Sequence, residues 1–243
     1  MRLSRVFVET PLASGAAVKL SGSAANHVTR VLRLRVGEAL TLFNGTGGEF
    51  AARIEAFTAS TVSVAVGEER TAERESPLGL TLAQGVSRGE RMDLVMQKAT
   101  ELGVTRLVPV LTERSVVRLD ADQAERKHAH WRAIVIAACE QSGRNRPPGV
   151  SPPQALTDFL RAGADSGTKL LLAPGAQLRL PEIPRPVTAV TVLIGPEGGL
   201  TPEEQERAVA AGFVGVRLGP RVLRTETAAL TALALLQQEF GDL

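Results

Sequence analysis

The chain has few of the residues that build disulfides, metal centres or the common nucleotide-binding loops. Cys139 is its one cysteine, which excludes an internal disulfide and a cysteine-based metal cluster. His128 and His130 are two residues apart in a predicted helix and therefore point in nearly opposite directions. No Gly-x-Gly-x-x-Gly follows a predicted strand and no Walker A sequence occurs, so the Rossmann and P-loop classes lack their defining parts. We expect no metal site.

Aromatic residues and long apolar runs are also scarce. The chain has no tyrosine and one tryptophan, which argues against a base-stacking platform of the RRM type. No apolar run approaches the roughly 20 residues of a membrane-spanning helix, and Met1–Arg5 lacks the apolar core of a signal peptide. We therefore expect a cytoplasmic protein that has no membrane partner.

The charge of the chain is nearly balanced but its basic residues are lopsided. The 28 basic and 26 acidic residues leave a formal net charge of +2, which does not by itself indicate a nucleic-acid partner. Of the basic residues 24 are arginine and four are lysine. The planar guanidinium suits phosphate and guanine contacts. A base-composition bias of the genome would produce the same excess, so both interpretations stay open.

Residues 1–70 are predicted to form a small β-rich unit. Apolar and polar residues alternate roughly every second position in five short runs, which is typical of strands. The runs are Val6–Val8, Val18–Leu20, Leu40–Phe43, Phe50–Ile54 and Val62–Val66. The charged stretch Glu68–Pro77 has no apolar period, and residues 71–77 within it are predicted to be a linker.

One helix, Ala24–Leu34, is predicted inside this β-rich unit, with Ser23 as its cap. Its apolar residues share one face of a helical wheel: Ala25, Val28, Val31 and Leu32. Polar residues occupy the opposite side: Asn26, His27, Arg30 and Arg33. This polar side is either a solvated face or a contact for RNA phosphates.

Residues 78–243 alternate between predicted strands and helices, which favours a mostly parallel sheet with helices on both faces. The strands are expected near residues 78–82, 107–111, 170–173, 190–194 and 214–218, and the helices at 92–102, 122–142, 202–212 and 227–240. Thr201, Pro202 and Glu204 match a capping box with proline at the first helical position.

Two glycine-bearing motifs stand between a predicted strand and a predicted helix, at Ile194–Leu200 (IGPEGGL) and Leu218–Ala228 (LGPRVLRTETA). Glycine lets a ligand approach the backbone closely, and a helix start exposes N–H groups. Steric demands of a tight turn would explain the glycines alone, and a helix cap would explain Thr225 or Thr227. Two arginines and a glutamate in the second motif exceed what capping needs. Together the loops predict a backbone-lined ligand pocket.

These motifs resemble the two C-terminal signatures of the RsmE family, the ribosomal small-subunit RNA methyltransferases that modify uridine at N3. The resemblance extends along nearly the whole chain. Asn26–Arg33 resembles the N-terminal motif of the family, and three further segments resemble its middle motifs: Ser87–Met92, Gln97–Val104 and Ala138–Arg146.

The resemblance implies a SPOUT-class α/β domain with a deep trefoil knot and a mostly parallel sheet, preceded by a PUA-like RNA-binding β-barrel. It implies a homodimer that acts on 16S rRNA or on the assembled small ribosomal subunit. S-adenosylmethionine (SAM) would lie among three loops. The residues expected to bind it are Leu172, Ala173, Pro174, Ile194, Gly195, Pro196, Glu197, Gly198, Gly199, Leu218, Gly219, Val222, Leu223, Thr225, Thr227 and Ala228.

The uridine N3 carries an imide proton, so the site must remove that proton or stabilise the anion. Arg221 and Arg224 are candidates for stabilising the uracil oxygens or the RNA backbone, or they shape the loop. Glu226 is a candidate base or water-orienting group, or a hydrogen-bond acceptor for the cofactor. The residues expected to meet RNA are Arg5, Asn26, His27, Arg30, Arg33, Arg88, Arg91, Arg144 and Arg146.

Two other functions compete with this one. A knotted methyltransferase could act on another RNA or on a ribose 2′-oxygen, although the matching motifs outside the cofactor loops argue against it. A non-catalytic RNA-binding assembly factor could keep the fold. The glycines of the first loop and Arg224 favour an enzyme, because a pure binder has no need of a cofactor pocket.

Overall fold

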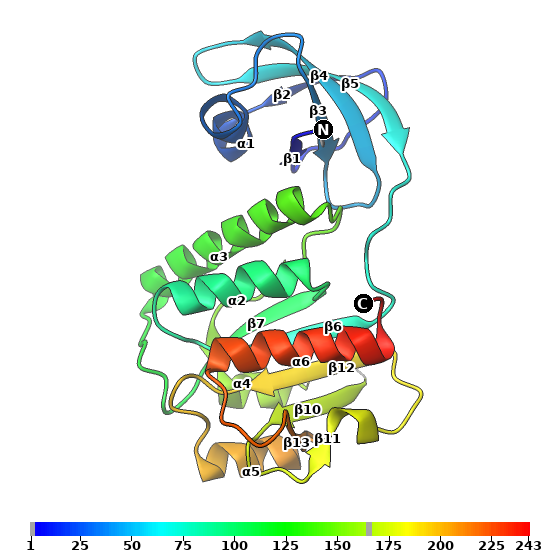
Figure 1. The fold of residues 1–243 in the computed structure, drawn as a ribbon. Coiled ribbons are helices and arrows are strands. Elements are labelled where there is room, and N and C mark those ends of the chain that lie inside the picture. The colour runs from blue at the N-terminus through cyan, green and yellow to red at the C-terminus, as the bar shows by residue number, and fades with distance from the viewer. Residues whose placement is uncertain (1–2, 164–166) are drawn as a thin grey trace. The chain divides into compact units, whose positions relative to one another are not determined.

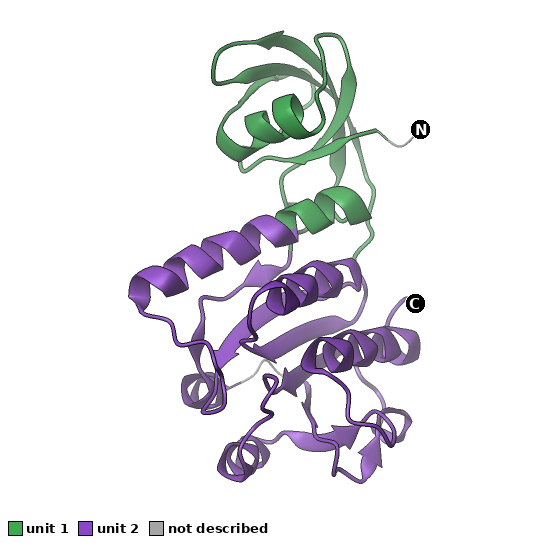
Figure 2. Ribbon diagram, turned by 60° about the vertical axis from the view of Figure 1, so that its left-hand side comes forward, with its two compact units in different colours: residues 1–75, 136–147 green, residues 76–135, 148–243 purple. Residues whose placement is uncertain are grey.

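A computed structural model describes residues 3–163 and 167–243. The chain divides into two compact units (Figure 2). The first holds the residues up to Glu75 together with Ile136–Pro147, and the second holds Ser76–Val135 and Pro148–Leu243. The division inferred from sequence, with a β-rich domain at 1–70, a linker at 71–77 and an α/β domain at 78–243, stays a prediction. The structure adds a segment from just past the middle of the sequence, 136–147, that groups with the N-terminal unit.

The N-terminal unit is built on a curled five-stranded sheet with the order β1-β3-β4-β5-β2 (Figure 1). Its strands are β1 (Arg5–Phe7), β2 (Ala17–Leu20), β3 (Ala39–Phe43), β4 (Glu49–Phe57) and β5 (Val62–Arg70). All five predicted strands are confirmed. Their alternation sends one set of side chains, including Leu40, Leu42 and Ile54, into a common core.

The β5 strand extends beyond the predicted run Val62–Val66 into the charged stretch. Glu68–Arg70 continues β5, and Arg70 pairs with Glu49 in the antiparallel ladder with β4. Backbone pairing with the neighbouring strand holds residues 68–70 in the sheet, although their charged side chains show no apolar alternation.

The helical insert is shorter and less regular than predicted. It consists of α1 (Gly22–Asn26) and a π-helical turn, His27–Val31, and its N-cap is Ser21 rather than Ser23. The Leu32 N–H bonds to the His27 carbonyl at 2.9 Å, five residues back. This wider turn rotates the following residues relative to an α-helix. Val31, predicted to share the packed face, is 68% exposed for this reason.

A buried polar network holds residues 143–146 against the strands of the N-terminal unit. The Arg5 guanidinium pairs with Glu49 and donates to the Arg144 carbonyl at 3.0 Å and to the Asn145 side chain at 2.6 Å. Asn145 in turn donates to the Ala72 carbonyl. Arg5 and Asn145 are 6% and 0% exposed, so this network replaces the solvent that these groups lose.

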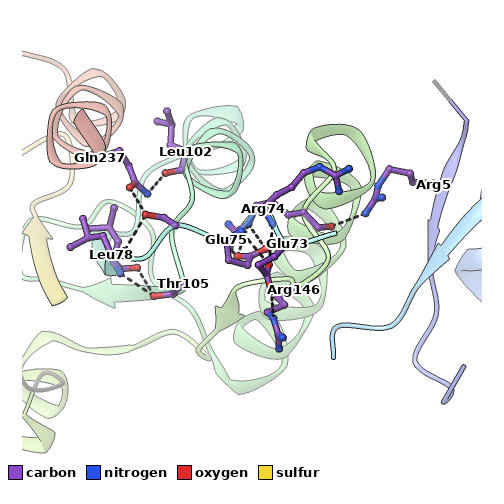
Figure 3. Close-up of polar contacts among 12 residues, drawn as sticks. Arg5, Glu73, Arg74, Glu75, Leu78, Leu102, Thr105, Arg146 and Gln237 are labelled. Atoms are coloured by element: carbon purple, nitrogen blue, oxygen red, sulfur yellow. Dashed lines mark hydrogen bonds and ion pairs between the residues drawn. The ribbon is translucent and has the colours of Figure 1, made fainter. Parts of the chain in front are cut away.

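The segment Glu73–Glu75 belongs to the same network (Figure 3). Arg74 donates to the Gly143 carbonyl at 3.0 Å and to Glu49 at 3.3 Å. Glu75 accepts from the buried Arg144 guanidinium, with Nε 3.0 Å from Oε2. The ion pairs therefore fix a stretch that composition alone suggested to be a linker.

The second unit is built on an eight-stranded sheet in which every pairing is parallel. The order along it is β11-β13-β10-β12-β6-β7-β8, with β9 pairing β7. Its strands are β6 (Gly79–Gly85), β7 (Arg106–Leu111), β8 (Gly149–Val150), β9 (Gln154–Ala155), β10 (Thr168–Leu172), β11 (Leu178–Arg179), β12 (Ala189–Ile194) and β13 (Val214–Arg217). The predicted α/β class with a mostly parallel sheet is confirmed.

Helices cover both faces of this sheet (Figure 1). They are α2 (Glu90–Glu101), α3 (Ala121–Ser142), α4 (Leu156–Ala162), α5 (Pro202–Ala210), α6 (Thr225–Phe240) and a 3₁₀ turn, η2 (Leu180–Glu182). Along β6, Leu80 and Leu82 pack in the core beneath α2 and α6, whereas Ala83 packs in the core with α4 and α5. The buried strands are therefore apolar on both sides.

One helix start, that of α5, agrees with the prediction, and another, that of α6, differs from it. Thr201 and Glu204 form the predicted capping box, with reciprocal bonds of 3.2 and 2.9 Å. The closing helix α6 begins at Thr225, two residues before the predicted start. Near its far end, the buried Gln237 side chain donates to the Leu102 carbonyl at 2.8 Å and accepts from Ser76 (Figure 3). The α4 helix and the two-residue strands were not predicted, because such short segments show no clear period.

We predict that Glu49→Ala weakens the N-terminal unit. The substitution leaves the Arg5 guanidinium buried without this carboxylate, which typically costs about 3 kcal/mol. Hydrogen exchange of the β4 and β5 amides measures the loss locally and should become about 100-fold faster, since ~1.4 kcal/mol corresponds to a factor of ten.

Asp158→Ala is the matched control, because it removes an exposed carboxylate that pairs with Arg161 at 2.9 Å. Such a surface pair is worth at most about 1 kcal/mol. Equal exchange rates in the two variants would show that the buried network does not stabilise the sheet.

Candidate functional site

A cavity of about 480 Å³ lies where three neighbouring parallel strands end. Because β13, β10 and β12 are adjacent and parallel, the segments that follow them meet at one edge of the sheet. Crevices at the carboxyl ends of strands are the common ligand sites of open α/β sheets. The volume lies within the range of ~300–1,000 Å³ found for small-molecule sites.

The cavity brings together the loop residues expected from sequence. The predicted cofactor-binding residues that line it are Leu172, Ala173, Pro174, Ile194, Gly195, Pro196, Glu197, Gly198, Gly199, Leu218, Gly219, Val222, Leu223, Thr225 and Ala228. The candidate catalytic residues Arg221, Arg224 and Glu226 line it as well. Thr227 does not, and it is exposed on α6. Arg91, expected to meet RNA, also lines this cavity. The roles of these residues stay predictions.

Two glycines shape the first loop for different reasons. Gly199 has a φ of +68°, a left-handed conformation that glycine adopts without strain. At Gly195 the constraint is space, because a Cβ atom there would lie 2.9 Å from the Gly199 carbonyl carbon and from the Leu200 nitrogen. The loop therefore folds back on itself and leaves its backbone facing the cavity.

Thr225 joins this loop to α6 and β6. Its hydroxyl donates to the Gly195 carbonyl at 2.7 Å and accepts from the Gln84 side-chain amide at 2.8 Å. Gln84 is 1% exposed and also donates to the Gly85 carbonyl at 3.1 Å. The ends of β6 and β12 and the start of α6 are thereby held in one hydrogen-bonded chain.

Arg114 and Glu204 support the same loop from its other side. The Arg114 guanidinium donates to the Gly198 carbonyl at 3.1 Å. The Glu204 carboxylate, 2% exposed, accepts from the Glu113 N–H at 2.8 Å as well as from its own capping partner, Thr201. The residues after β7 are therefore fixed to the segment after β12.

Arg91 bridges two acidic groups at the cavity wall. Its guanidinium is 2.9 Å from Glu197 Oε1 and 3.9 Å from Glu226 Oε1. Burial acts to raise the pKa of the Glu197 carboxyl. The backbone N–H groups of Glu197 and Arg88, together with Arg91, outweigh burial and lower this pKa below its ordinary value. Glu197 is thus held as a carboxylate.

Glu226 supplies an acceptor that the protein leaves unused. Its Oε2 atom is buried and has no hydrogen-bond partner among the residues that the structure describes. A buried acceptor of this kind calls for a donor from a ligand. The remaining wall combines apolar side chains, such as Leu172 and Leu218, with the backbone of the glycine loop. A ligand with an apolar body and a few N–H donors suits this lining.

The residues expected to meet RNA fall into two groups in the N-terminal unit. Asn26 and Arg30 are exposed on the helical insert, and Arg33 is exposed two residues after its end. Arg5 and Arg144 are 6% and 4% exposed and pair with Glu49 and Glu75. In this structure neither of these two arginines presents its guanidinium to an RNA phosphate, because each is enclosed with a carboxylate.

The other residues expected to meet RNA differ in their exposure and in their partners. Arg146 is exposed and pairs with Glu73 at 3.3 Å, and Arg88 is exposed on the second unit. His27 lies 3.5 Å from Glu140. Glu140 also accepts from the Phe7 N–H at 3.0 Å, and burial raises the pKa of its carboxyl. The motif around Glu140 therefore serves the packing of the N-terminal unit.

Sequence reasoning missed Gln84, Arg114 and Glu204 as parts of the site. Each of the three contacts the site through a residue at least 80 positions away in the sequence, so no local sequence pattern could indicate its role. Within residues 3–163 and 167–243, no group of three or more His, Cys, Asp or Glu is placed to hold a metal ion. Among the helices formed by these same residues, none has the length and apolar content needed to cross a membrane.

Two family models match the chain. Residues 74–237 match the model of an RNA methyltransferase domain, and residues 20–66 match that of an RNA methyltransferase PUA domain. The chain is 33% identical over 242 residues to the ribosomal RNA small subunit methyltransferase E of Buchnera aphidicola, covering 100% of this chain and 98% of that protein. It is 32% identical to the Bacillus subtilis protein of the same name, over 90% of this chain and 89% of the other.

Solved structures give the same result. A Neisseria gonorrhoeae ribosomal RNA small subunit methyltransferase E bound to S-adenosyl methionine superposes with a TM-score of 0.91, at 40% identity and 99% coverage of both chains. A Legionella pneumophila protein in complex with the cofactor SAM gives 0.96, at 44% identity and 100% coverage of both. Fold and site thus define an RNA methyltransferase of the SPOUT type with a PUA-like N-terminal unit. The chain belongs to the ribosomal RNA small subunit methyltransferase E family.

We predict that Thr225→Val destabilises the second unit. The change removes a buried hydroxyl and leaves the Gly195 carbonyl and one Gln84 N–H without this partner, at a cost of about 1–3 kcal/mol. Urea unfolding followed through the fluorescence of the buried Trp131 measures the difference. Thr227→Val is the control, since Thr227 is exposed two residues further along α6. Identical midpoints for the two variants would contradict the assigned role of the Thr225 hydroxyl.

Proposed function

We propose that this protein transfers a methyl group from SAM to N3 of a specific uridine in 16S rRNA. The observation that carries the proposal is the cavity formed by the segments after β10, β12 and β13 in a chain of this family. The name shared by its relatives gives small-subunit rRNA as the substrate class. The N3 position rests on the resemblance of the sequence motifs.

The lining of the cavity fits SAM. Leu172, Leu218 and Leu223 offer apolar walls for an adenine ring and a methionine chain, and the backbone of Gly195–Gly199 offers polar groups at close range. The unpartnered Glu226 oxygen and the Glu197 carboxylate favour the cationic groups of this cofactor. Bound SAM supplies a methyl group made electrophilic by its sulfonium.

The residues of the second motif prepare the uridine. Glu226, which lines the cavity, is assigned to accept the N3 proton, and this turns the neutral imide into an anion with charge on N3 and both ring oxygens. Arg224 and Arg221 are assigned to stabilise that charge where it develops. Arg224 forms no ion pair with any part of the chain that the structure describes, so its guanidinium is available to the substrate.

The N-terminal unit is proposed to bind the RNA backbone through Asn26, Arg30 and Arg33, which are exposed. The target uridine must be unpaired or flipped out, because its N3 edge is hidden in a paired helix. In functional terms, residues 1–70 are assigned to RNA binding, 71–77 to the connection and 78–243 to methyl transfer. A cytoplasmic location follows from this substrate.

A deep trefoil knot and a homodimer are part of the proposal. In support of the knot, the segment between β10 and β12 contains β11, which pairs on the far side of β13. Thus β13 lies between two parts of one loop, and α6 contacts η2 of that loop as well as β12. In support of the dimer, Val222 of the cavity loop is 82% exposed, a position that a second copy would cover. Sedimentation equilibrium measures the mass directly.

We expect the protein to bind SAM in titration calorimetry and to methylate small-subunit rRNA, with mass mapping placing the label on N3 of one uridine. Arg224→Ala should lower kcat by about 100-fold, because a group that stabilises developing charge is lost. Arg161→Ala is the control, since Arg161 is exposed on α4. Absence of SAM binding at millimolar concentration would overturn the enzyme proposal and leave a non-catalytic RNA-binding factor.

We also expect the exposed arginines of the insert to set the salt dependence of RNA binding. Combining Arg30→Ala with Arg33→Asn removes two cations, and asparagine tolerates the positive φ of Arg33. The slope of log Kd against log salt should fall by about 0.7–0.9 per lost phosphate contact. A filter-binding series between low and high salt measures it, and an unchanged slope would show that this face is only solvated.

A further inference from the structure

A second hollow adjoins the cofactor cavity and shares three residues with it. Its volume is about 560 Å³, and it is lined by Glu90, Arg91, Asp93, Leu94, Gln97, Ile134, Arg224 and Glu226. Arg91, Arg224 and Glu226 line both spaces. A group placed in the hollow therefore reaches the cavity across these three side chains.

The three shared side chains form a pattern of hydrogen-bonding groups. Arg91 and Arg224 carry only donors, whereas the Glu226 carboxylate carries only acceptors. The Nε atom of Arg91 lies 3.9 Å from Glu226 Oε1, too far for a hydrogen bond, and the second oxygen of Glu226 has no partner among the residues described. The shared wall thus presents two donors and an acceptor whose hydrogen-bonding capacity is not filled by the protein.

Uracil has the complementary pattern along its N3 edge. That edge presents the acceptor O2, the donor N3–H and the acceptor O4, so it needs two donors and one acceptor between them. Cytosine presents two acceptors and a donor, because its N3 carries no proton and its 4-position carries an amino group. An acidic oxygen facing N3 therefore favours uracil over cytosine.

The rest of the hollow suits a base better than a phosphate. Leu94 is 40% exposed and Ile134 is half-buried, so each offers an apolar surface for a ring face. Flipped bases are commonly held between apolar side chains and recognised along the pairing edge. Three carboxylates and two guanidiniums line the hollow, and this excess of negative charge opposes a phosphate.

Two polar side chains of the hollow, Asp93 and Arg91, are held in place by other residues. Both carboxylate oxygens of Asp93 contact α3. One accepts from Trp131 at 3.2 Å, and the other lies 2.9 Å from His130. Arg91 is held by Glu197 at 2.9 Å. At the wall shared with the cavity, Glu226 keeps a buried oxygen, Oε2, that has no partner among the residues described.

We propose that this hollow is the binding site of the flipped-out pyrimidine, and that Arg91, Glu226 and Arg224 read the N3 edge of uracil there. The assignment rests on the proposed methyltransferase function, since it locates the base that receives the methyl group. It makes Arg91 a substrate-recognition residue, held by Glu197 beside the loop that lines the cofactor cavity.

The hollow is tested by filling it. Gln97 is exposed on α2, so Gln97→Trp places a large ring in the hollow without disturbing the core. The KM for small-subunit RNA should rise by about tenfold or more, as for the loss of one good base contact, while the Kd for SAM stays unchanged because Gln97 does not line the cavity. Ile134→Trp fills the opposite wall and should act alike.

Ala133→Trp is the matched control, since Ala133 is exposed on the same helix one residue from Ile134 and does not line the hollow. Circular dichroism melting of each variant verifies folding. If Gln97→Trp has the RNA KM and turnover of Ala133→Trp, the base does not bind in the hollow and the proposal is overturned.

Base reading is tested separately from catalysis. Short single-stranded RNAs that differ only in one uridine or cytidine are compared by fluorescence anisotropy without SAM. The unaltered protein should favour uridine by about fivefold or more, and Glu226→Gln should reduce this preference because an amide also donates. No preference in the unaltered protein would overturn the base-reading assignment. A uridine preference without rRNA methylation would instead contradict the proposed function and keep the hollow as a pyrimidine site.

Discussion

The hydroxyl group of Thr225 is the contact on which the site depends. The cavity is assembled from loops that are separated by tens of residues in sequence, and each loop by itself is a short irregular segment. Thr225 joins them, because its hydroxyl group donates to the Gly195 carbonyl and also accepts from the Gln84 side-chain amide. The start of α6 is fixed to the ends of two strands in this way, and the side chains of Arg224 and Glu226 take their positions from that helix start.

Much of this fold could be predicted from the sequence, and the exceptions have physical causes. Buried parallel strands such as β12 are mostly apolar runs, and the Thr201–Glu204 capping box has a local signature, so both could be predicted. The π-helical turn at His27–Val31 was missed, because one shifted hydrogen bond leaves the sequence pattern unchanged. Strand order was also beyond reach, since the pairing of β13 with both β10 and β11 depends on contacts distant in sequence.

The candidate site shows the same division between local and distant signals. Glycine loops at strand ends are visible in a sequence, and they lead to most of the residues that line the cavity. The roles of the arginines are harder to predict, because this one residue type serves several purposes in the structure. Arg144 is enclosed with Glu75, Arg91 joins two acidic groups at the cavity, and Arg30 is exposed on the insert. Composition reports only their number, whereas burial and partners decide what each one does.

The membership of residues 136–147 in the N-terminal unit has a consequence for the order in which the protein forms on the ribosome. Arg5 is synthesised well before two of its partners, because the Arg144 carbonyl and the Asn145 side chain follow it by 139 and 140 residues. Most of α3 and the first strands of the second unit are made in between. The polar network around Arg5 can therefore close only after residues 144 and 145 have been synthesised, so the N-terminal unit cannot complete its core before that point.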